Sequence, residues 1–128
     1  MHNFRYVFLT FSILASLFLM PTASAAEKVL RHVVMYKFKD SVPPAQVQEV
    51  IDAFAGLPKK INTIVDFEMG TNVSPEGKSE GFTHVFVVTF KSEKDRDDYL
   101  VHAAHADYVK VVTGKREKVV VFDYWATK

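Results

Sequence analysis

The chemistry that this sequence can support depends on a few histidines and one tyrosine. His32 and His84 each stand in a stretch of alternating apolar residues, and Tyr99, His102 and His105 follow one another at intervals of three. A neutral imidazole is a general base near its working pH, and a tyrosine hydroxyl can donate a hydrogen bond to a developing oxyanion. These groups suit proton abstraction next to a carbonyl, or the binding of a phenolic or enolic compound, and neither task requires a cofactor.

Two other interpretations of the histidines remain open at this point. A histidine on an apolar strand face is more often a hydrogen-bonded core residue than a catalyst, so His32 and His84 can be structural. The pair His102 and His105 has a spacing that metal ligands on a helix can have, but Cys is absent and no carboxylate stands at ligand spacing. We therefore predict neither a metal nor a cofactor.

The elements that must position these residues alternate between strands and helices. A period of two residues predicts strands over residues 29–39, 63–73, 82–91 and 117–126. Apolar residues at helical spacing predict one helix that Ser41 caps and that ends at Gly56, and a second that runs from Ser92 to Gly114. Residues 72–81 have the composition of an exposed loop. The order β-α-β-β-α-β predicts an α+β, ferredoxin-like sandwich, with two helices on one face of an antiparallel sheet.

This topology predicts a pocket between the sheet and the helices. Tyr99 and His105 are its candidate catalytic residues, and His32 and His84 would face it from the strands. Its remaining predicted walls are Val34, Tyr36, Phe54, Phe86 and Val121.

The other face of the sheet also carries apolar residues. Val33 and Met35 alternate with the pocket-facing residues of the first strand, and Val85 and Val87 do so in the third. An exposed apolar patch of this kind usually marks an interface. We therefore predict that the chain forms a homodimer through this face.

The first 26 residues have the order of a cleavable signal peptide. Arg5 precedes the apolar run from Tyr6 to Met20, and small residues follow Pro21, so that cleavage after Ala25 or Ala26 is expected. The run is shorter than the roughly 20 residues that a transmembrane helix needs. We therefore expect an exported protein, periplasmic or secreted, in which residues 27–128 form a single domain.

The charge of that domain limits its partners. Arg5 is the only Lys or Arg among residues 1–26, so 15 basic residues face 15 acidic residues in the rest of the chain. Nucleic acids and anionic membrane surfaces select proteins with a basic excess. We therefore expect no nucleic-acid partner and no stable membrane association after cleavage.

An ordered set of segments resembles the dimeric stress-responsive α/β-barrel (Dabb) domain family. These segments are Arg31–Asp40, Met69–Gly77, Glu80–His84, Thr89–Phe90 and Asp98–His105. The resemblance extends from about His32 to Trp125. It implies a ferredoxin-like unit that pairs through its sheet into a barrel-like dimer, in a family most of whose members have no assigned activity.

The pocket also resembles that of a plant polyketide cyclase in this family. That resemblance implies catalytic roles for Tyr99 and His105 in cofactor-independent aldol chemistry, and places His32, His84 and Asp123 near the substrate. Two departures, Phe54 in place of a tyrosine and Arg116 in place of a tryptophan, argue against a long-alkyl polyketide substrate. Export argues against it as well, because carrier-bound polyketide intermediates are intracellular.

Two functions follow as hypotheses. In the first, the pocket binds a small carbonyl or phenolic compound, and any turnover is acid–base chemistry of the cyclase, lyase or isomerase type. In the second, the chain is a non-catalytic, stress-associated structural dimer. Haem or oxygen chemistry is a third alternative, and it rests on fold analogy alone.

Overall fold

The computed structural model describes residues 27–127, which form four strands and three α-helices. In chain order these are β1 (Lys28–Phe38), α1 (Pro44–Ala55), the short 3-10 helix η1 (Leu57–Lys59), β2 (Asp66–Thr71), β3 (His84–Phe90), α2 (Glu93–Leu100), α3 (Ala103–Val112) and β4 (Arg116–Thr127). The expected signal peptide, residues 1–26, lies outside the described residues. Within residues 27–127 no helix has the length and apolar character needed to cross a membrane.

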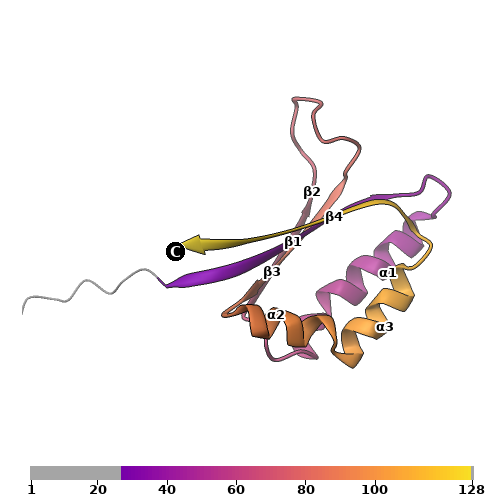
Figure 1. Cartoon of the computed structure of the whole chain (residues 1–128). Helices are drawn as coiled ribbons and strands as arrows, with labels where there is room; N and C mark the ends of the chain where they lie inside the picture. Colours follow the sequence, from indigo (N-terminus) through magenta and orange to yellow (C-terminus); the bar gives the residue numbers. More distant parts are fainter. Residues whose placement is uncertain (1–26, 128) are drawn as a thin grey trace, which may run out of the picture.

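The strands form one antiparallel sheet in the order β2-β3-β1-β4. All the helices lie on one face of this sheet, and the other face carries no helix (Figure 1). The predicted ferredoxin-like sandwich is therefore confirmed.

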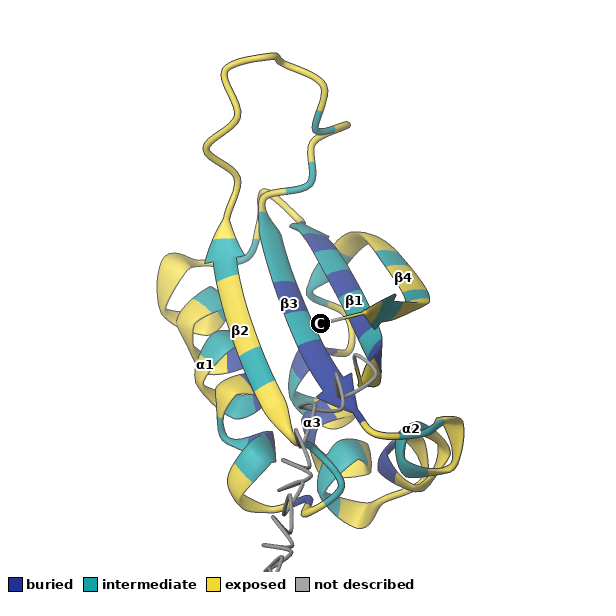
Figure 2. Cartoon of the chain, turned by 90° about the vertical axis from the view of Figure 1, so that its left-hand side faces the viewer, coloured by how far each residue is buried: buried dark blue, intermediate teal, exposed yellow. Residues whose placement is uncertain are grey.

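The core lies between the sheet and the helices. Burial alternates along β1, where His32, Val34 and Tyr36 are buried and the residues between them are partly exposed, a pattern visible in Figure 2. From the helix side, Phe54 of α1 stacks on Phe86 of β3 with ring centroids 4.3 Å apart and planes at 2°. The strand residues that the period of two assigns to the helix-facing side are thus those that build the core.

The predicted second helix is divided into α2 and α3. At the joint, the backbone of His102 is extended (φ −67°, ψ 141°), and its Nδ1 accepts a hydrogen bond from the Ala104 amide at 3.0 Å. His102 therefore caps the start of α3, as an Asp or Asn side chain would. The expectation of one helix up to Gly114 is wrong at this position.

The two helix starts expected from the sequence differ in outcome. Ser92 caps α2 as predicted, since its Oγ accepts a hydrogen bond from the Asp95 amide at 3.0 Å. Ser41 does not cap α1. The capping position belongs to Pro43, which makes no side-chain bond, and Pro44 occupies the first turn, where its missing N–H is not needed.

The helix-free face of the sheet, which we call the open face, is apolar at its centre. Val33, Met35, Val85 and Val87 are partly exposed there, as predicted, and Phe122 and Tyr124 of β4 add side chains that are 62% and 44% exposed. The loop between β2 and β3 extends beyond the end of the sheet (Figure 2).

Candidate active site

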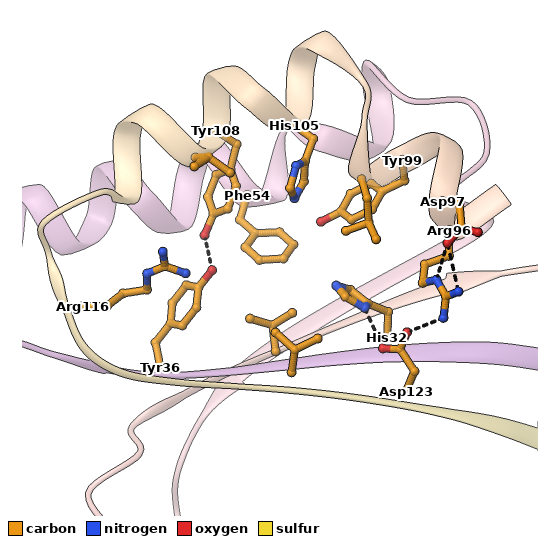
Figure 3. A pocket seen from close by; sticks show the side chains of 14 residues that line it. His32, Tyr36, Phe54, Arg96, Asp97, Tyr99, His105, Tyr108, Arg116 and Asp123 are labelled. Atoms are coloured by element: carbon orange, nitrogen blue, oxygen red, sulfur yellow. Dashed lines mark hydrogen bonds and ion pairs between the residues drawn. The ribbon is translucent and has the colours of Figure 1, made fainter. Parts of the chain in front are cut away.

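A cavity of about 390 Å³ lies between the sheet and the helices. It is lined by most of the residues predicted from the sequence, namely His32, Val34, Tyr36, Phe54, Tyr99, His105, Val121 and Asp123. Figure 3 shows these side chains converging from β1, β4 and the three helices. The volume of the cavity is at the lower end of the range of small-molecule pockets.

Tyr99 and His105 face each other across the joint between α2 and α3. Their ring centroids are 4.6 Å apart and the rings meet edge to face, while the His32 ring lies 5.7 Å from that of Tyr99. Tyr99 is 1% exposed, yet its hydroxyl points into the cavity beside the His105 ring (Figure 3). A ligand in the cavity would therefore meet an imidazole and a phenol side by side.

The environment sets complementary protonation states for this pair. Burial lowers the pKa of His105, and the nearby His32 lowers it further, against a smaller opposing effect of a hydrogen bond with the Leu100 backbone. Burial also raises the pKa of Tyr99 well above its ordinary value. At neutral pH, His105 is thus an uncharged base and Tyr99 is a protonated donor.

One end of the cavity is lined by a chain of hydrogen-bonded polar groups. His32 Nδ1 lies 2.7 Å from one oxygen of Asp123, and Arg96 donates to the other oxygen at 2.8 Å. Arg96 also contacts Asp97 at 2.9 Å. Its hydrogen bond with Asp123 is the main reason that the pKa of Arg96 is raised. The carboxylate of Asp123 therefore orients the His32 ring, and is itself oriented by Arg96.

The opposite end is built from two tyrosines and an arginine. The hydroxyls of Tyr36 and Tyr108 lie 2.7 Å apart, and the Arg116 guanidinium carbon lies 5.1 Å from the centre of the Tyr36 ring. Burial raises the pKa of both tyrosines, so both hydroxyls keep their protons. Tyr108 was not predicted from the sequence, although its position three residues after His105 was a usable signal.

Two predicted site residues lie outside this cavity. Phe86 lies under Phe54 and supports the wall without lining it. His84 contacts the ring of Phe38 at 5.1 Å and lies 2.8 Å from the Thr83 hydroxyl. Contrary to expectation, it does not join His32, because it pairs with Tyr36, four residues and about 13 Å further along the strand. It lines a second hollow of about 500 Å³ beside the β2–β3 loop.

The β2–β3 loop contains the residue pattern of a serine nucleophile, but not in the structural setting that such a nucleophile occupies in hydrolases. Gly77, Ser79 and Gly81 have the G-x-S-x-G spacing, which in hydrolases occupies a strand-to-helix turn. Here the segment joins two strands instead. Among residues 27–127, His, Asp and Glu form no group of three that could hold a metal ion.

Comparisons with known proteins agree with this architecture. The family profile of the stress responsive A/B barrel domain (Dabb) matches residues 30–126. The stress-response A/B barrel domain-containing protein HS1 of Arabidopsis thaliana is 35% identical over 80% of this chain and 94% of its own length. Olivetolic acid cyclase of Cannabis sativa is 34% identical over 77% of this chain and 98% of its own length. A dimeric, ferredoxin-like protein of unknown function from Bacteroides fragilis superposes with a TM-score of 0.61 at 27% identity, over 75% of this chain and 94% of that chain.

Proposed function

Because the chain belongs to the stress-responsive A/B barrel (Dabb) domain family, we propose that its cavity binds a small carbonyl or phenolic compound and acts on it without a cofactor. The observation that carries this proposal is the pairing of Tyr99 with His105 at 4.6 Å in an apolar cavity. The name of the cyclase relative supports chemistry of the same general class.

The chemistry divides between the two side chains. The Tyr99 hydroxyl donates a hydrogen bond to the carbonyl oxygen of the ligand, and His105 removes a proton from the adjacent carbon. The electron pair of the broken C–H bond moves onto the oxygen as an enolate, which Tyr99 stabilises. The proton then returns from His105 to a carbon or an oxygen of the product, so the protein ends in its starting state.

A binding screen tests the first step. We expect phenols and aryl ketones such as 4-hydroxyacetophenone to raise the melting temperature of residues 27–128. Tyr99→Phe should weaken this binding roughly tenfold, because a hydrogen bond in a dry site contributes about 1–1.5 kcal/mol. His84→Gln, outside the cavity, is the matched control. A screen without any stabilising ligand would contradict the proposal and favour a structural role.

Dimerisation through the open face is the second part of the proposal. Structural relatives of this chain are dimeric ferredoxin-like proteins. Phe122, at 62% exposed, stands with Tyr124 and Met35 on an apolar face that a second copy would cover. The same apolar face favours the alternative function, in which the chain acts as a non-catalytic, stress-associated structural dimer.

The open face makes a specific prediction about assembly. Phe122→Asp should convert a dimer into monomers at micromolar concentration, because it places a charge at the centre of the apolar contact. Val119→Asp puts the same charge on the opposite face of β4 and should leave the dimer intact. The molecular mass from light scattering distinguishes the two, and a monomeric wild-type chain would refute this part of the proposal.

Export completes the proposed function. It rests on the apolar run from Tyr6 to Met20 and on the small residues before Glu27. The N-terminal residue of the protein recovered from cells should accordingly be Ala26 or Glu27. Recovery of the uncleaved chain would contradict a cleaved signal peptide.

A further inference from the structure

The two ends of the cavity differ in how their positive charges are balanced. At the end near His32, Arg96 contacts the carboxylates of both Asp97 and Asp123. At the other end, Arg116 forms no ion pair with any carboxylate of residues 27–127. The adjacent Glu117 is already paired with Lys37 at 2.9 Å. A guanidinium without a carboxylate partner among these residues therefore lines one end of an apolar cavity.

A second donor lies beside this guanidinium. Tyr36 and Tyr108 are 2% and 4% exposed, and their hydroxyls are hydrogen-bonded to each other at 2.7 Å. Each hydroxyl carries one hydrogen, and a bond between the two uses only one of them. The other O–H is left to donate. Figure 3 shows the Arg116 guanidinium approaching this pair at the cavity wall.

We propose that Arg116 and the Tyr36–Tyr108 hydroxyl pair form an anion subsite, and that the ligand of this cavity carries a carboxylate at that end. Guanidinium and phenol donors together match the two acceptor oxygens of a carboxylate. The carbonyl or phenolic end of the same ligand lies at Tyr99 and His105. The inference rests on the proposed function and narrows its substrate class to small keto acids or phenolic acids.

The size of the cavity limits these ligands further. A volume of about 390 Å³ fits a single ring with short substituents better than a long chain. Arylketone carboxylates of different length, such as 4-acetylbenzoate and 3-(4-acetylphenyl)propanoate, are therefore suitable probes. Their primary amides have nearly the same shape and no charge. The third probe, 4-hydroxyacetophenone, has a hydroxyl where the others have a carboxylate or an amide.

The experiment compares these probes by calorimetry on the wild-type protein and on Arg116→Gln. At least one carboxylate should bind ten times or more tightly than its amide to the wild-type protein. Arg116→Gln should remove this difference while leaving the affinity for the amide within about threefold. Arg116→Lys keeps the charge and should retain part of the preference. Lys118→Gln removes one positive charge from the opposite face of the same strand and should change neither affinity.

The possible failures are distinguishable. Equal binding of carboxylate and amide to the wild-type protein, or a carboxylate preference that survives in Arg116→Gln, would overturn the anion subsite and leave the proposed function standing. Binding of 4-hydroxyacetophenone together with rejection of every carboxylate would do the same. If no probe binds, the proposed function fails first. Melting temperatures of the variants show whether each is folded.

Discussion

Phe54→Ala should lower the free energy of unfolding by about 3–5 kcal/mol, the usual cost of removing a buried aromatic ring. Phe54 is 1% exposed and stacks on Phe86 at 4.3 Å and on Phe67 at 5.6 Å. The Phe54 ring also packs against that of Tyr108, with ring centroids 4.7 Å apart. The ring thus joins α1 to β2, β3 and α3 at one point. Urea unfolding at a fixed protein concentration measures the loss.

Phe54→Leu is the control for this prediction. It keeps most of the buried volume and should cost less than about 1.5 kcal/mol. Because Phe54 also lines the cavity, the alanine variant should enlarge it and weaken binding of 4-hydroxyacetophenone. A cost below about 1 kcal/mol for Phe54→Ala would mean that neighbouring side chains fill the vacated space, and that the stack is not central to stability.

His105→Gln should slow proton exchange between aryl methyl ketones and heavy water by about 10²–10⁴-fold, the usual contribution of a positioned general base. Glutamine keeps much of the volume of histidine but cannot accept the proton. The methyl protons of 4-hydroxyacetophenone, followed by NMR, report the rate. Melting temperature and ligand affinity should change little, since the variant loses the group that accepts the proton and keeps most of the side-chain volume.

The pH dependence of the same reaction identifies the base. Since burial lowers the pKa of His105 below its ordinary 6.5, the residue is neutral at pH 7, and it becomes protonated only below pH 6.5. The wild-type rate should therefore be level near neutral pH and fall on acidification below that value. His105→Gln should lack this acidic limb. His84→Gln should retain it, although burial also lowers the pKa of His84, because His84 lies outside the cavity.

The strands and their faces could be predicted from the sequence because each face has its own environment. The alternation of His32, Val34 and Tyr36 with partly exposed neighbours records which side the helices cover. The division between α2 and α3 could not be predicted in this way. No Gly or Pro marks it, and the interval from Tyr99 to His102 to His105 equally fits one continuous helix.

The candidate site was predictable only as far as local spacing reaches. Tyr99 and His105 stand close together in the chain, whereas the contact of Arg96 with Asp123 joins residues 27 positions apart, and that of His32 with Asp123 spans 91. No local pattern encodes such pairs, and Asp123 entered the prediction through the family resemblance alone. The anion subsite was missed for the same reason, since it joins Tyr36 of β1 to Tyr108 of α3.

The joint at Val101 and His102 has a consequence for the proposed acid–base pair, Tyr99 and His105. In one unbroken α-helix, six residues turn through about 600°, so Tyr99 and His105 would point about 120° apart around the helix axis and would not project from the same side. The joint redirects the second helix and brings the two rings to 4.6 Å. The relative placement of base and donor is thus a property of backbone torsion at two residues. A family member with the same tyrosine and histidine but a joint of another length would hold them in another geometry, and would lack the proposed acid–base arrangement.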